Sequence, residues 1–195
     1  AQFDAPWALE FLPDGKMLIS EMGGAMKLVD QNGVFLHRIT GVPDVVFKGQ
    51  GGMGDIKVHP RFERNRLIYL SYAEKGEKDL LGTAVARARL VVEDNIGHLE
   101  RIEVIWRQTK AEGYGHYGQR IVFGPDGYLW ISSGDRQRGD PAQDMKSNLG
   151  KIIRLNDDGS LPADNPFPSP NAVTSEVWSL GHRNPLGLSF DESGR

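Results

Sequence analysis

The chain has 195 residues and a net charge of −3, with 39% hydrophobic and 25% charged residues. This length suits one domain. The scattered lysines and arginines form no clustered basic face, so no nucleic-acid partner is expected. The absence of cysteine excludes disulfides and thiolate sites. No apolar run reaches the roughly 18 residues of a membrane span, and the first residues do not have the pattern of a signal peptide.

Short apolar segments alternate with glycine-rich turns along the whole chain, and no convincing amphipathic helix interrupts them. They predict three sets of four strands and the first strand of a further set. The predicted strands cover 7–12, 16–22, 25–30, 34–39, 55–60, 67–73, 83–91, 102–108, 119–124, 128–134, 150–156 and 176–182. The sets span 7–39, 55–108, 119–182 and, in part, 186–195.

The strands repeat a sequence motif as well as a spacing. LEFLPDGKMLISE, IVFGPDGYLWISSGD and LSFDESGR share an apolar strand, an acidic-glycine turn and, in the first two, a second apolar strand. Recurring four-stranded units indicate an all-β fold, a β-propeller. A β-sandwich also has many short strands, but it has no reason to repeat one hairpin motif. An incomplete ring leaves an open sheet edge, so we expect the chain to be a fragment of a longer protein.

Two motifs point to sites that we reject. Gly49, Gly51 and Gly54 form a GxGxxG pattern, but a strand follows it where a dinucleotide site needs a helix. Residues 156–160, NDDGS, resemble a calcium loop but lack a properly spaced glutamate, so they are predicted to form a hairpin turn. The histidines other than His116 show no spacing typical of metal ligands.

Polar residues gather where the fourth strand of one set leads to the first strand of the next. Gln50, His116 and the pair Arg183 and Asn184 occupy three such connections, 66 and 67 positions apart. Asp135 begins the loop after the second strand of the third set, which opens on the same face of a propeller. That loop, residues 135–150, is expected to form a wall of the site.

These residue types suit proton transfer beside an anionic group. A histidine is the usual base near neutral pH, and a neighbouring carboxylate fixes its tautomer. An arginine supplies a fixed positive charge, and amides orient ligands by hydrogen bonds. Each residue also has a purely structural interpretation: His116 bonded to backbone, Asp135 and Asn184 in turns, Arg183 as a clamp on carbonyls, Gln50 in solvent. Their shared face favours the site.

The chain resembles the soluble glucose/sorbosone dehydrogenase family, closest to its aldose sugar dehydrogenase branch. The motifs that carry the resemblance are PWALEFLPDG, GQGGMGDI, GHYGQRIVFGPDGYLWISSGD, LGKIIRLNDDG and GHRNPLGL. The resemblance covers nearly the whole chain in the right order. It implies a six-bladed propeller, pyrroloquinoline quinone (PQQ) and calcium as cofactors, and a periplasmic or extracellular location. It implies an aldose substrate, oxidised at C1 to the lactone with hydride transfer to the quinone; the electron acceptor is not identified.

Carried onto this sequence, the resemblance makes His116 the general base and Asp135 its support. Arg183 and Asn184 would bind the quinone, with Arg183 also stabilising charge on its reduced oxygen, and Gln50 would contact cofactor and substrate. Gly115 stands where some members have a polar side chain that contacts sugar. The calcium ligands and the remaining quinone ligands are expected beyond residue 195, so residues 1–195 alone are expected to be inactive.

Two other classes of function remain open from the sequence. Some relatives keep the scaffold without the chemistry, so a non-catalytic propeller that acts as a binding or interaction module is the alternative. A lactonase-type hydrolase would need a metal held by carboxylates in the channel, and few candidates are present. The joint presence of His116, Asp135, Arg183 and Asn184 favours the enzyme.

Overall fold

The computed structural model describes residues 1–194; Arg195, the last residue of the predicted segment 186–195, lies outside them. The described chain forms three four-stranded antiparallel sheets, each built from consecutive strands. The strands are β1 (Pro6–Phe11), β2 (Met17–Glu21), β3 (Ala25–Val29), β4 (Phe35–Ile39), β5 (Met53–Val58), β6 (Leu67–Lys75), β7 (Leu81–Glu93), β8 (Ile96–Arg107), β9 (Gly118–Phe123), β10 (Leu129–Ser133), β11 (Lys151–Leu155) and β12 (Val177–Leu180). The helical pieces are α1 (Phe62–Asn65), α2 (Ala172–Glu176), η1 (Glu77–Asp79) and η2 (Asp140–Ala142).

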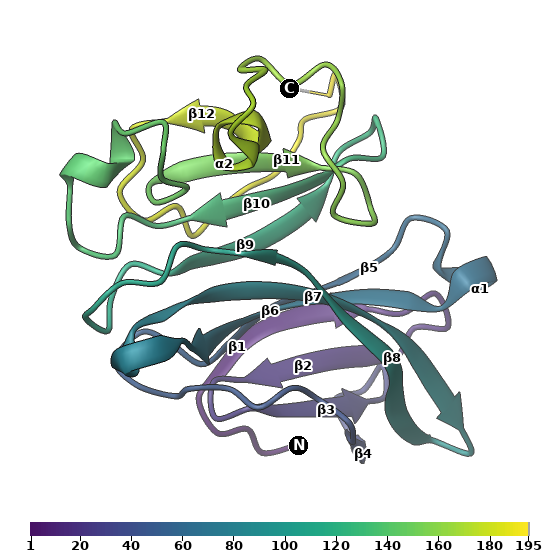
Figure 1. Cartoon of the computed structure of the whole chain (residues 1–195). Helices are drawn as coiled ribbons and strands as arrows, with labels where there is room; N and C mark the ends of the chain where they lie inside the picture. The colour runs from purple at the N-terminus through teal and green to yellow at the C-terminus, as the bar shows by residue number, and fades with distance from the viewer. Residues whose placement is uncertain (195) are drawn as a thin grey trace.

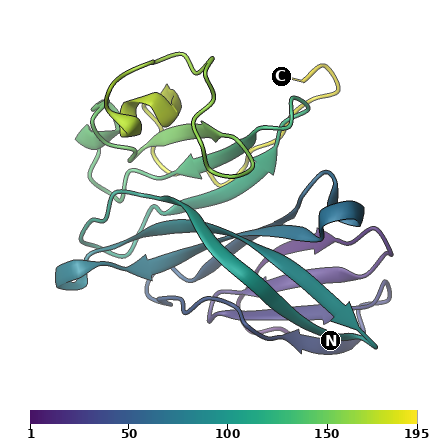
Figure 2. The same ribbon diagram turned by 45° about the vertical axis from the view of Figure 1, so that its right-hand side comes forward.

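The three sheets lie side by side like blades, in chain order (Figures 1 and 2). The first strands are neighbours, because β1 contacts β5 and β5 contacts β9, and the other strands of each sheet follow outward. This confirms the predicted all-β propeller architecture, with three blades present.

Apolar side chains fill both spaces between the blades. Leu18, Leu28, Ile56 and Leu70 are among those that pack between the first and second sheets. Tyr69, Val85, Ile121, Leu129 and Ile153 are among those between the second and third. Strands that are buried on both faces explain the near-continuous apolar runs of the sequence.

A serine on the second strand of each blade ties that blade to the chain segment that follows it. Ser20 accepts a hydrogen bond from its own first strand and donates to the first strand of the following blade, at Gly54 O (2.7 Å). Ser71 donates in the same way to Gln119 O (2.6 Å), and Ser132 donates to Pro185 O (2.9 Å). Each pair of first and second strands has an irregular register, and the hydroxyl satisfies the groups left unpaired there.

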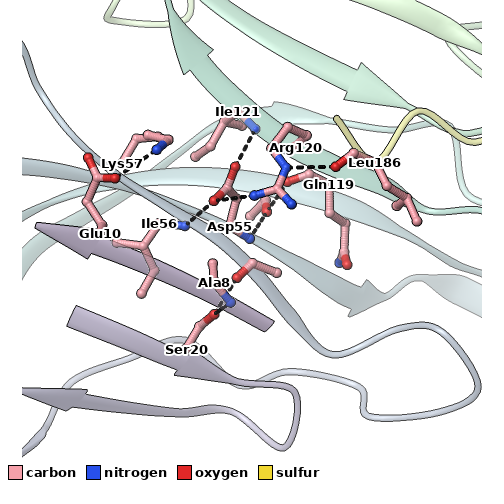
Figure 3. A network of polar contacts seen from close by, with 12 residues as sticks. Ala8, Glu10, Ser20, Asp55, Ile56, Lys57, Gln119, Arg120, Ile121 and Leu186 are labelled. Atoms are coloured by element: carbon pink, nitrogen blue, oxygen red, sulfur yellow. Dashed lines mark hydrogen bonds and ion pairs between the residues drawn. The ribbon is translucent and has the colours of Figure 1, made fainter. Parts of the chain in front are cut away.

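The hydrogen bonds of Ser20, Ser71 and Ser132 form a belt along the inner strands. A buried carboxylate reinforces this belt between the second and third blades (Figure 3). Asp55, only 1% exposed, accepts hydrogen bonds from the backbone of Ile121 (2.9 Å) and Ile56 (3.1 Å) and from Arg120 Nη1 (3.2 Å). Burial raises the pKa of Asp55, and these donors oppose that rise. Arg120 also donates from Nε to Leu186 O (3.0 Å), so the network reaches the segment after the third blade.

Three regions differ in detail from the predicted strands. The β7–β8 hairpin is longer, because Asp94 and Asn95 both adopt left-handed φ values (49° and 64°) and close a tight turn. Residues 156–160 do turn tightly, but β12 follows only after a long connection and α2. Residues 186–194 contain no strand, because a strand needs a partner and the described chain places none beside this segment.

Candidate functional site

His116 lies in the connection between β8 and β9, in a left-handed backbone conformation (φ 51°) that a non-glycine residue rarely adopts. Its carbonyl packs against Gly134, where a Cβ atom would collide with it. Gly134 directly follows β10, so the end of that strand and the His116 loop are in close contact. The glycine before Asp135 is therefore required by this approach.

The imidazole of His116 and the carboxylate of Asp135 form a buried pair. Nδ1 of His116 lies 2.7 Å from Oδ1 of Asp135, and each residue is 5% exposed. Asp135 is held in turn by its backbone, which donates to Arg183 O (2.8 Å), and its Oδ1 accepts from the Gln137 backbone (2.8 Å). Because a carboxylate can only accept, a neutral imidazole in this pair would carry its proton on Nδ1 and present a lone pair on Nε2.

Arg136 clamps the loop that carries His116. Its guanidinium donates to Gly115 O and Gly113 O, both at 2.6 Å, and lies 3.6 Å from the ring centre of Tyr117. Arg136 and Tyr117 are each 2% exposed. Burial lowers the pKa of Arg136 and raises that of Tyr117. These two charge-assisted hydrogen bonds, to Gly113 O and Gly115 O, fix the position of the loop that carries His116.

Gln50 and Asn184 hold the same loop from the neighbouring connections. Oε1 of Gln50 accepts from the backbone of His116 (2.8 Å), and Oδ1 of Asn184 accepts from the backbone of Gly118 (3.0 Å). Both line a pocket of about 270 Å³ that also borders Gly118. With their oxygens engaged, their NH₂ groups are the donors left for a ligand.

A second, shallow pocket of about 340 Å³ opens over the histidine and carboxylate. Its lining includes His116, Asp135, Gln137 and two guanidinium groups, those of Arg138 and Arg183. Arg183 is exposed, and its side chain has no hydrogen-bond partner within residues 1–194. Arg138 is paired with Glu112 (3.4 Å), so Arg183 is the guanidinium left for a ligand, and the pocket joins it to a proton acceptor. This suits an anionic ligand next to a group that loses a proton.

The wall of this pocket is anchored by a buried lysine. Lys151, at the start of β11, is fully buried and donates to the carbonyls of Pro141 (2.8 Å), Ala142 (3.0 Å) and Leu149 (2.8 Å). Burial lowers its pKa to about 8. Three carbonyls of residues 135–150 therefore converge on one ammonium group, which gives this long loop a defined shape.

The structure brings all five predicted site residues around the His116 loop, but in two groups. His116, Asp135 and Arg183 line the shallow pocket, whereas Gln50 and Asn184 line the adjacent one. Sequence reasoning missed Arg136, Gln137 and Lys151. The only signal for the first two was their position directly after Asp135, and no signal distinguished the lysine from a surface residue.

Within residues 1–194, no three His, Cys, Asp or Glu side chains lie where they could together hold a metal ion. No helix in that range has the length and apolarity to cross a membrane. The calcium ligands expected beyond residue 195 stay a prediction.

The chain is similar to known proteins along nearly its whole length. The aldose sugar dehydrogenase YliI of Escherichia coli (strain K12) is 39% identical over 97% of this chain and 51% of its own length. The crystal structure of the Escherichia coli aldose sugar dehydrogenase in its apo form superposes with a TM-score of 0.91 at 38% identity, covering 98% of this chain and 55% of that one. The chain thus spans about half the length of these relatives.

A third relative was solved with a cofactor in place. The PQQ-bound aldose sugar dehydrogenase of Streptomyces coelicolor superposes with a TM-score of 0.82 at 29% identity, covering all of this chain and 55% of that one. Residues 3–195 match the family model described as Glucose / Sorbosone dehydrogenase. The chain therefore belongs to the glucose/sorbosone dehydrogenase family.

Proposed function

We propose that the full-length protein oxidises an aldose at C1 to the lactone, with pyrroloquinoline quinone as cofactor and His116 as the general base. The observation that carries the proposal is the buried pair of His116 and Asp135, 2.7 Å apart, at a pocket bordered by Arg138 and Arg183. Family membership supplies the substrate class and the cofactor.

In this proposal His116 takes the proton of the C1 hydroxyl on Nε2. Asp135 accepts the Nδ1–H, keeps Nε2 free and stabilises the imidazolium that forms. As the proton leaves, the C1–O bond becomes the carbonyl of the lactone and the C1 hydrogen departs as hydride. The bound quinone supplies the hydride acceptor.

The residues of this chain fit an anionic quinone with several carboxylates. Arg183 and Arg138 border the shallow pocket, and the first is exposed and unpaired within residues 1–194. The free NH₂ groups of Gln50 and Asn184 add neutral donors on the other side of the His116 loop. Arg183 would pair with a carboxylate or with the oxygen that gains negative charge.

The proposal assigns no calcium ligand to this chain, because calcium takes six to eight oxygens and residues 1–194 hold no acidic cluster for it. It places the protein in the periplasm or outside the cell, as the resemblance implies. The chain by itself is expected to be inactive, because the family's remaining quinone ligands are expected in the other half of the protein.

The test is reconstitution of the full-length protein with PQQ, followed by reduction of an artificial electron acceptor with a panel of aldoses. A saturable, quinone-dependent rate is expected, and His116→Ala should lower kcat roughly 10²–10⁴-fold. His98→Ala, on the outer strand of the second blade and paired only with Glu100, is the matched control and should keep the rate.

Failure of the full-length protein to bind quinone or to oxidise any aldose would overturn the proposal. In that case the scaffold would serve as a non-catalytic binding or interaction module.

A further inference from the structure

Gln137 occupies an unusual position beside the pair of His116 and Asp135. Arg136 and Gln137 both have left-handed φ values, 56° and 60°, although neither is glycine. Consecutive residues in this region cost free energy, and such strain concentrates at functional sites. Here the buried guanidinium of Arg136 and the bond from the Gln137 backbone to Asp135 (2.8 Å) hold the turn.

This turn places the side-chain amide of Gln137 against the α-carbon of Gly115. A Cβ atom placed on Gly115 would lie 2.5 Å from Cδ, 2.6 Å from Oε1 and 2.8 Å from Nε2 of Gln137. Gly115 itself has no left-handed φ. Its backbone would therefore accept alanine, and the atoms nearest to an added Cβ are those of the neighbouring amide.

The amide of Gln137 is available to a ligand. Gln137 is exposed, lines the pocket with His116 and Asp135, and its side chain has no hydrogen-bond partner within residues 1–194. A primary amide offers one acceptor and two donor hydrogens at one point. A hydroxyl, which both donates and accepts, is the group that matches it.

We propose that Gln137 is a specificity-determining residue that binds the sugar hydroxyl next to the one deprotonated by His116. This inference rests on the proposed function, since it needs an aldose in the pocket. In the pyranose the neighbouring hydroxyl is on C2. Gln137 supplies, from the loop after β10, a polar contact that Gly115 has no side chain to make.

The test compares an aldose with its 2-deoxy analogue in the full-length protein reconstituted with PQQ. Gln137→Ala should lower kcat/KM for the aldose about 5- to 30-fold and leave that for the 2-deoxy sugar nearly unchanged, because one neutral hydrogen bond is lost. Gly115→Ala should push the amide aside and have the same effect. The double variant should be no worse than either single variant.

Gln31→Ala, an exposed glutamine in the turn between β3 and β4, is the control. The inference is overturned if the wild type oxidises aldoses but Gln137→Ala changes neither sugar, or both equally. It is also overturned if the variant weakens quinone binding, measured by absorbance titration, since the amide would then contact the cofactor. A wild type that oxidises no aldose overturns this inference together with the proposed function.

Discussion

The inner strands repeat the same contact from blade to blade, whereas the loops at one end of those strands differ in every blade. Ser20 and Ser71 each bridge to the first strand of the next blade, and Ser132 bridges to Pro185 O in the segment after the third blade, over 2.6–2.9 Å. Above them, the loop after the second strand is short in the first two blades and long in the third, where it carries Asp135. The repeated serine contacts form the scaffold, and the long loop that differs in the third blade forms the pocket.

Backbone strain follows the same division. His116, Gln119, Arg136 and Gln137 have left-handed φ values and lie in or beside the His116 loop. None of the three serines of the belt has such a φ, and Gln119, whose carbonyl accepts from Ser71, lies where the belt meets the His116 loop. A regular belt that is satisfied by repeated hydrogen bonds can support strained loops whose geometry serves binding. The two regions should therefore respond differently to substitution, the belt in stability and the loops in activity.

The largest loss of stability is expected when the buried carboxylate of the belt, Asp55, is removed. Asp55→Ala leaves the Ile121 and Ile56 backbone donors without their acceptor and removes the partner of Arg120. The free energy of unfolding should fall by about 3 kcal/mol, measured by denaturant titration. Asp14→Ala, which removes an exposed pair with Lys16, should cost less than about 1 kcal/mol. Equal costs would refute the role of the belt.

A second buried carboxyl sharpens the contrast because it has fewer donors than Asp55. Burial raises the pKa of Glu176 to about 7, although the side chains of Asn148 (Nδ2 at 2.8 Å) and Trp106 oppose that rise. With the folded pKa above the ordinary glutamate value of 4.5, the folded state binds a proton that the unfolded chain has released. Stability contributed by this group is present below pH 4.5 and lost as pH rises to 7.

Glu176→Gln should remove this dependence. The variant should match the wild type at pH 4 and be more stable by about 3 kcal/mol at pH 8, measured as the difference in unfolding free energy across that range. An unchanged difference at every pH would show that Glu176 does not titrate in this window.

Arg136→Lys tests the loop region with charge retained. Lysine can reach one carbonyl but cannot bridge Gly113 and Gly115 or stack flat on Tyr117. We expect kcat/KM for aldose oxidation to fall about tenfold through misplacement of His116. Arg64→Lys, at the exposed end of α1, is the control. A variant with wild-type kinetics would show that the clamp does not position the base.

The smallest effects come from single serines of the belt. Each serine-to-alanine change leaves a backbone carbonyl without its donor (Gly54 O, Gln119 O or Pro185 O), so about 1 kcal/mol should be lost at Ser20, Ser71 or Ser132. Only Ser132→Ala should also lower activity, because its acceptor Pro185 O adjoins Asn184. Ser189→Ala, exposed after the third blade, is the control. Unequal costs would contradict the equivalence of the three sites.

The periodic features of the fold could be predicted from the sequence. Alternating apolar segments and repeated acidic-glycine turns located all twelve strands and the face on which Gln50, His116 and Arg183 converge. That face follows from antiparallel order alone, since successive connections must alternate between the two ends of a blade. The proximity of His116 to Asp135 follows from it.

The contacts that fix the site could not be predicted. Gln50 and Asn184 use their oxygens to hold backbone N–H groups, and that choice depends on where the His116 loop lies. Arg136 is buried although arginines at the end of a strand are usually exposed. Asp55, in a glycine-rich stretch, gave no pattern. Such roles depend on residues distant in the chain rather than on local spacing.

The most direct test of the account is the tautomer of His116, measured by ¹⁵N NMR of the full-length protein labelled at histidine, with His116→Gln for assignment. We predict that at neutral pH the proton is on Nδ1, bonded to Asp135, and that Nε2 carries the lone pair. Asp135→Asn should disturb this arrangement. A proton found on Nε2 would contradict the account, because the ring could not then take a hydroxyl proton at the pocket.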